Sequence, residues 1–167
     1  MGRPSVLLLC CLGLPACQDQ SDYLRAHDAL NRALLTTIWD VLRQPDRLEM
    51  LSLSHRRRPD DGPEERLFHG YRVLGRASID DVAQRRQIVS AFYQSAREGD
   101  GEMLCFMPHH ALHAVRGNAV VDIVICFHCR LYQVFDGQER PFAELSTLAQ
   151  ALYERVVREH HLPVERD

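Results

Sequence analysis

Cysteine and histidine are concentrated in one short stretch of this chain, residues 105–129 (CFMPHHALHAVRGNAVVDIVICFHC). Thiolate and imidazole groups together form the ligand set that a structural zinc ion prefers. Cys126 and Cys129 form a CxxC pair, which supplies two ligands. The other two would come from Cys105 together with His109 or His110. Zinc binding is therefore one chemistry that this stretch predicts.

The same cysteines permit other chemistry. Neighbouring thiols of an exported protein tend to form disulfides, because the compartment is oxidising. Residues i and i+3 of a flat strand point to opposite faces, so a Cys126–Cys129 bond requires a turn or bulge. A bond from Cys105 to either partner is equally open, and all three can simply pack as small buried residues. Thiol redox catalysis ranks lowest, because its CxxC normally begins a helix and this one follows a strand.

A β-hairpin brings these residues together. Gly117-Asn118 is a two-residue turn signal, and tight closure there sets the pairing of the flanking strands. In that register His113 faces Asp122, which predicts a modest cross-strand ion pair. His109 then faces Cys126, so the cysteines and the His109-His110 pair fall near one end of the hairpin. Both faces of the hairpin are largely apolar, so each must be covered, with helices the obvious candidates.

The hydrophobic periodicity along the chain predicts an α+β fold in a single domain, residues 21–167. Residues 55–66 are almost entirely charged and polar, which predicts a mobile solvated loop. The predicted sheet is mainly antiparallel, has four to six strands and packs against about three helices. The expected strands are Glu49–Ser54, Leu67–Ser78, Met103–Met107, His110–Arg116, Ala119–Phe127 and Arg130–Phe135. The expected helices are Ser21–Arg43, Ser78–Glu98 and Phe142–Glu159.

Composition restricts the function. The 167 residues carry 20 basic and 23 acidic side chains, a net charge of −3 at pH 7. An acidic chain of this kind lacks the basic face that broad nucleic-acid binding needs, so no nucleic-acid partner is expected. The chain also contains no P-loop, dinucleotide glycine fingerprint, GxSxG elbow or HExxH motif. We therefore expect no catalytic residues, and a binding or structural role is favoured over an enzymatic one.

The N-terminus resembles a bacterial lipoprotein signal peptide. An arginine precedes an apolar run, and Leu14-Pro15-Ala16-Cys17 has leucine at −3, a small residue at −1 and cysteine at +1. The resemblance implies cleavage after residue 16 and a covalent lipid on Cys17, with residues 17–20 as a tether to the lipid bilayer. Gln18 at the next position favours the outer membrane. The alternative is a cleaved secretory signal that leaves a free protein.

Three further segments resemble an uncharacterised family of small exported bacterial proteins, many of them lipoproteins. They are Phe68–Gly75 (FHGYRVLG), the CFxPxH pattern that begins at Cys105, and the DxxICFxC pattern that begins at Asp122. The resemblance covers about residues 49–162 and implies no established activity. Family members often have arginine where this chain has His109, which favours His110 as the shared ligand.

These observations predict an envelope lipoprotein, anchored by lipid and facing the periplasm or the cell surface. Its expected role is non-enzymatic binding or structural support. The alternative is a zinc-binding protein, and a thiol–disulfide redox protein is the less favoured third hypothesis. The candidate metal or disulfide residues are Cys105, His110, Cys126 and Cys129.

Overall fold

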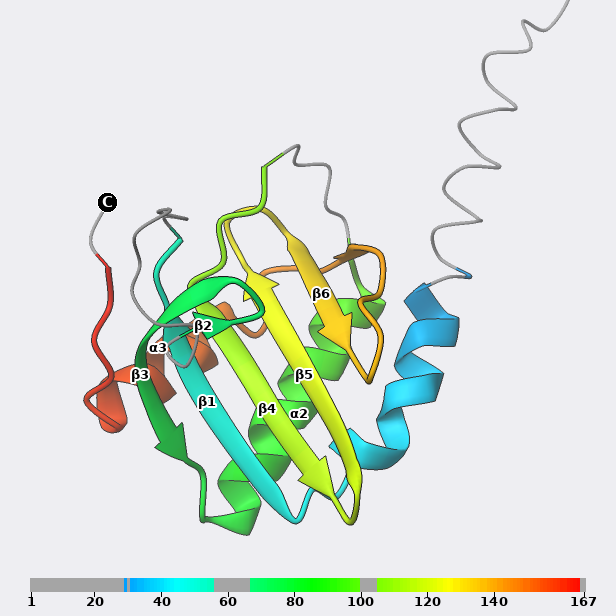
Figure 1. The fold of residues 1–167 in the computed structure, drawn as a ribbon, viewed down its shortest axis with the longest axis horizontal. Coiled ribbons are helices and arrows are strands. Elements are labelled where there is room, and N and C mark those ends of the chain that lie inside the picture. Colours follow the sequence, from blue (N-terminus) through cyan, green and yellow to red (C-terminus); the bar gives the residue numbers. More distant parts are fainter. Residues whose placement is uncertain (1–28, 30, 56–66, 100–104, 166–167) are drawn as a thin grey trace, which may run out of the picture.

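The computed structural model describes residues 29, 31–55, 67–99 and 105–165. Its centre is a curled antiparallel sheet of seven strands in the order β2-β3-β1-β4-β5-β6-β7 (Figure 1). The α+β prediction for a single domain is confirmed, with one strand more than the predicted upper limit. The strands are β1 (Arg47–Leu53), β2 (Leu67–Phe68), β3 (Tyr71–Ser78), β4 (His110–Arg116), β5 (Ala119–Cys126), β6 (Leu131–Phe135) and β7 (Ala143–Glu144).

Helices cover one face of this sheet (Figure 1). They are α2 (Val82–Arg97), α3 (Gln150–Glu159) and a first helix over residues 31–42. Their apolar sides pack on the inward-facing residues of β4 and β5, including Leu112, Ile123 and Ile125, to form the main core. The side chain of Asp81 caps α2 by accepting a hydrogen bond from the backbone N–H of Gln84 at 2.6 Å.

The opposite face is covered by the sheet itself. A β-bulge at Ser52/Leu53 in the pairing of β1 with β3 marks where the sheet bends. The short β2–β3 hairpin curls over the front of β4 and β5 (Figure 1). The prediction that helices cover both faces is therefore wrong for this one. The small core beneath the curl contains Leu51, Leu53, Phe68, Tyr71, Ala111 and Val124.

Several predicted element bounds change for local reasons. His69 and Gly70 adopt positive φ values of 51° and 82°, which divide the expected strand Leu67–Ser78 into β2 and β3. The prediction of a strand over Met103–Met107 is wrong for its described part, because residues 105–109 form no strand, and Pro108 has no N–H to contribute to a ladder. The last helix begins at Gln150, because the preceding residues form β7 and a turn.

The register of the β4–β5 hairpin is as predicted, with Arg116 opposite Ala119 and His113 opposite Asp122. The predicted signal peptide (1–16), the tether (17–20) and Cys17 lie outside the described residues, as does all but the first residue of the 55–66 loop. None of the described helices has the length and apolar character needed to cross a bilayer.

Candidate functional site: a histidine-lined pocket

Five separate segments enclose a cavity of about 580 Å³ at one end of the sheet. They are His55 just after β1, the segment that leads into the first residue of β4, the turn after β5, helix α3 and the segment that follows α3. We call this cavity the histidine pocket, because four of its lining side chains are imidazoles. The lining residues are His55, Met107, His109, His110, Phe127, His128, Gln150, Glu154, Val157, Arg158, Val164 and Glu165.

His110, the first residue of β4, is the buried polar group of the pocket. Its side chain is 8% exposed, and its Nδ1 has no hydrogen-bond partner among the described residues. Its ring lies edge-on to Phe127 and Tyr153, with centroid distances of 5.6 and 6.1 Å. Burial, with a smaller contribution from nearby His109, lowers the pKa of His110 to about 4, while Glu154 acts in the opposite direction. The imidazole is therefore neutral at pH 7.

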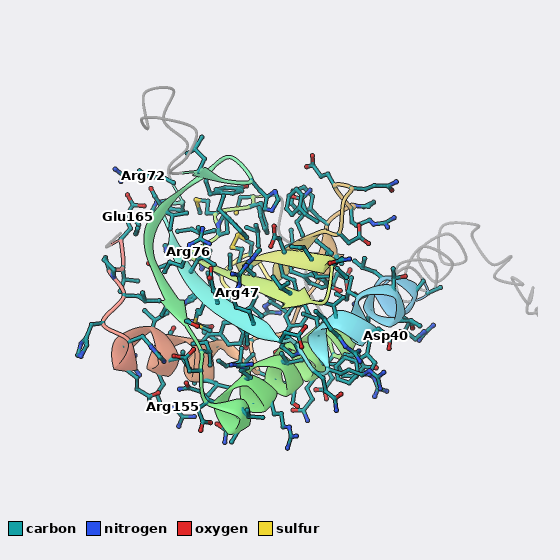
Figure 2. The ribbon with its side chains drawn as sticks, turned by 60° about the horizontal axis from the view of Figure 1, so that its bottom comes forward. Asp40, Arg47, Arg72, Arg76, Arg155 and Glu165 are labelled. Atoms are coloured by element: carbon teal, nitrogen blue, oxygen red, sulfur yellow. A yellow bond between two sulfur atoms is a disulfide. The ribbon has the colours of Figure 1, made fainter. Side chains whose placement is uncertain are left out.

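The segment after α3, residues 162–165, forms one wall of the pocket, and we call it the C-terminal strap. It crosses the sheet at Gly75 of β3, where an added Cβ would lie 2.6 Å from Cδ of Pro163. The strap ends at Glu165, which is labelled in Figure 2. The Glu165 carboxylate accepts hydrogen bonds from Ser54 Oγ at 2.7 Å and from the backbone N–H of His55 at 3.1 Å. Glycine at position 75 thus allows the strap to close the pocket.

Helix α3 contributes the charged wall. Residues 150, 154, 157 and 158 share one side of a helix, because i, i+4, i+7 and i+8 positions coincide. Glu154 Oε1 accepts a hydrogen bond from Gln150 Nε2 at 2.8 Å. The Arg158 side chain is exposed, and its guanidinium forms no hydrogen bond or ion pair with another side chain of the described residues. One acid and one base therefore face the cavity from consecutive turns.

The turn after β5 is closed by a disulfide between Cys126 and Cys129. The chain turns at residues 127–130, where Arg130 has a φ of 54°. A turn of this kind is what a disulfide between residues i and i+3 requires. Both cysteines are at most 1% exposed. Cys129 Sγ also accepts a hydrogen bond from the backbone N–H of Met107 at 3.2 Å. The disulfide thus holds Phe127 and His128 in place as pocket lining.

The four candidate residues from the sequence do not form one centre. Cys126 and Cys129 bond to each other, while Cys105 carries a free, half-buried thiol outside the pocket lining. His110 lines the pocket without a polar partner among the described residues. Within residues 29, 31–55, 67–99 and 105–165, no three His, Cys, Asp or Glu side chains are grouped so that they could hold a metal ion.

A second set of histidines lies on the other face of the sheet. Asp122 of β5 accepts from His113 Nδ1 at 2.6 Å, as the hairpin register predicts, and from His69 Nε2 at 2.7 Å. We call these three residues the sheet-face cluster. The His69 ring also stacks on Phe135 at 3.7 Å between centroids. The sequence did not predict His69, because only the curl of the β2–β3 hairpin brings it to β5.

Charged side chains extend the sheet-face cluster across β1 and β3. Arg47 Nη2 lies 3.4 Å from His113 Nε2, so Nε2 accepts and Nδ1 carries the proton that it donates to Asp122. Glu49 Oε2 pairs with Arg76 Nη1 at 2.7 Å. Figure 2 shows Arg47 and Arg76 over these two strands. Every imidazole of this cluster therefore has a protein partner.

The fold and the site define an α+β domain that carries a partly open pocket beside a disulfide-bonded turn. Comparison with known proteins gives no match to a family model, to a curated protein or to a solved structure. The geometry of the pocket is therefore the basis for assigning a function.

Proposed function

We propose that this protein is a lipid-anchored bacterial envelope protein whose domain binds a small ligand in the histidine pocket. The observation that carries the binding role is His110, a nearly fully buried imidazole without a hydrogen-bond partner in the described structure, lining a cavity of about 580 Å³. Leaving such a group unpaired costs about 1–3 kcal/mol, so the group is expected to have a partner that the chain itself does not supply.

The dimensions and lining of the pocket support a small-molecule ligand. Ligand pockets are typically about 300–1,000 Å³ and combine apolar walls with a few polar groups that orient the ligand. Here Met107, Phe127, Val157 and Val164 supply apolar surface, and His110 offers a neutral hydrogen-bonding group. A neutral imidazole is suited to orienting a ligand by a directional hydrogen bond rather than attracting it by charge.

The lipid anchor is proposed from the sequence alone. Cys17 stands at the +1 position of a lipobox-like segment, and several acyl chains on it would hold the domain at the bilayer. Replacing Cys17 by serine is expected to abolish incorporation of labelled palmitate and to release the protein from the membrane fraction. Mass spectrometry that finds an unmodified Cys17 in the wild type would contradict this part of the proposal.

The disulfide and the burial of both its cysteines favour a structural role for Cys126 and Cys129 over zinc binding or thiol exchange. Thiol–disulfide exchange requires attack on an accessible sulfur. Purified domain is therefore expected to show one reactive thiol after denaturation, that of Cys105, and no stoichiometric zinc. Three zinc-protected thiols would instead support the site made of Cys105, His110, Cys126 and Cys129.

Ligand binding is tested by NMR with a library of fluorinated fragments. The ¹⁵N signals of the His110 imidazole report whether a fragment occupies the pocket. We expect several fragments to shift these signals in the wild type and to lose binding in His110→Leu. His161→Asn is the control, because His161 is exposed, lies outside the pocket lining and has a φ of 52°, which asparagine tolerates. If no fragment in the library shifts the His110 signals, the binding role is wrong.

A further inference from the structure

The histidine pocket contains an acid and a base that are not paired with each other. Glu154 and Arg158 stand one turn apart on α3, a spacing at which opposite charges often form an ion pair. No ion pair joins them, although Arg155 and Glu159 on the same helix do pair, at 3.9 Å. Both side chains of the unpaired couple line the cavity. Their charges are thus available to a ligand.

The other charged group of the pocket is already occupied. Glu165 accepts from Ser54 Oγ and from the backbone N–H of His55, and it lies 3.3 Å from His55 Nδ1. Glu154, by contrast, accepts one described hydrogen bond, from the neutral amide of Gln150 at 2.8 Å. A carboxylate has about four lone-pair positions, so Glu154 retains capacity for a cationic donor. The charged groups that remain available to a ligand are therefore Arg158, which is positive, and Glu154, which is negative.

We propose that the ligand is zwitterionic, a free α-amino acid or short peptide with an apolar side chain, which rests on the binding role proposed above. Its ammonium group would pair with Glu154 and its carboxylate with Arg158, and Phe127 and Val157 would contact its apolar side chain. A ligand without charges would displace water from Glu154 and Arg158 without forming an ion pair with either. A ligand with one charge would leave the other charged group without a partner.

His110 fits this assignment because it stays neutral. Burial and the nearby His109 oppose its protonation, so it adds no net charge that would favour an anion over a zwitterion. Its imidazole can instead hydrogen-bond a peptide N–H or the ligand ammonium. The pocket volume of about 580 Å³ also lies within the range for small ligands, so a small peptide is of a suitable size.

The test is calorimetry on the wild-type domain with matched ligands. L-Phenylalanine, L-leucine and the dipeptides Leu-Leu and Ala-Phe are the zwitterionic probes. Phenethylamine lacks the carboxylate and 3-phenylpropionate lacks the ammonium. We expect at least one zwitterion to bind about tenfold or more tightly than either singly charged analogue, because each analogue leaves one charged wall group unpaired.

Variants of α3 identify the two charged contacts. Glu154→Gln and Arg158→Gln are each expected to weaken the zwitterion about tenfold. Glu159→Gln and Arg155→Gln change the same charges outside the pocket lining and are expected to leave affinity unchanged. The His113 and Asp122 signals of the sheet-face cluster verify that each variant is folded. Equal loss in the pocket and control variants would overturn the assignment.

The outcomes separate this proposal from the binding role itself. Fragments that shift the His110 signals while no zwitterion binds would overturn the zwitterion and leave the binding role standing. Analogues with one charge that bind as tightly as the zwitterions would have the same effect. If neither fragments nor zwitterions shift the His110 signals, both proposals are wrong.

Discussion

The two groups of histidines in this molecule differ in how their polar atoms are satisfied. In the sheet-face cluster, one carboxylate accepts from His69 at 2.7 Å and from His113 at 2.6 Å. In the histidine pocket, His110 is more deeply buried and has no hydrogen-bond partner in the described structure. The side chains of the cluster remain 15–26% exposed. The more exposed histidines therefore have hydrogen-bond partners within the protein, whereas the more buried His110 has none in the described structure.

This difference separates a structural role from a binding role. A hydrogen-bonded cluster fixes the β2–β3 hairpin to β5 and needs no further partner. A buried, unpaired imidazole lowers stability, and natural proteins tend to retain such groups where function requires them. Histidines are concentrated in both the sheet-face cluster and the histidine pocket. The two groups are distinguished by whether the imidazoles have hydrogen-bond partners.

The largest expected effect is the pH dependence that His110 causes. Its pKa is about 4 in the folded protein and about 6.5 in the unfolded chain. Between these values the unfolded chain binds a proton that the folded protein does not, so stability falls as pH falls. The loss from this residue is about 3 kcal/mol between pH 6.5 and pH 4. Urea unfolding at a series of pH values measures it.

His110→Leu is the control for this prediction, because it removes the titrating group and keeps an apolar side chain in its place. The variant is expected to lose about 3 kcal/mol less stability than the wild type over the same pH range. Glu154 and His109, which also influence the His110 pKa, are retained in both proteins. Parallel pH profiles for wild type and variant would show that His110 does not have a lowered pKa.

The next effect is the loss of the shared acceptor in the sheet-face cluster. Asp122→Ala leaves His69 and His113 without the carboxylate to which both donate, and we expect about 2 kcal/mol of destabilisation. Asp40→Ala is the control, because Asp40 forms an ion pair with Arg43 while its side chain is 81% exposed. That variant should change stability by less than about 1 kcal/mol. Equal urea midpoints for the two variants would mean that the cluster contributes nothing.

The sequence was sufficient for the parts of the fold that depend on local signals. The Gly117-Asn118 turn determined the β4–β5 register, and with it the His113–Asp122 contact. The predicted start of the second helix was less accurate, because the helix expected to begin at Ser78 is capped by Asp81 and begins at Val82. The curl of the sheet was not predictable in this way, since it depends on the bulge at Ser52/Leu53 and on tertiary packing.

The pocket could not be predicted from the sequence for a related reason. Its lining comes from five segments, and Glu165 reaches it only because Gly75 lets the strap cross the sheet. The His109-His110 pair and the CxxC pair were visible as a concentration of ligand-type residues. Their separation into a disulfide and a buried imidazole depends on the turn at residues 127–130, which the strand pattern did not indicate.

The smallest expected effect is a gain in stability, in contrast to the losses described above. At pH 8, where His110 is neutral in both folded and unfolded protein, His110→Leu replaces an unpaired buried polar group by an apolar one of similar volume but different shape. Removing the unpaired group gains about 1–3 kcal/mol and the loss of ring packing against Phe127 and Tyr153 offsets part of it. We expect a net gain of about 1 kcal/mol in urea unfolding.

The same substitution in the sheet-face cluster gives the comparison its sharpest form. His113→Leu removes a donor that has its partner, so Asp122 loses a hydrogen bond and stability is expected to fall by about 1 kcal/mol. Opposite signs for His110→Leu and His113→Leu would mean that the domain is held together by one set of histidines and weakened by the other. A loss of stability in both would imply that His110 has a structural partner in the folded protein, and the reason for assigning the pocket to a ligand would disappear.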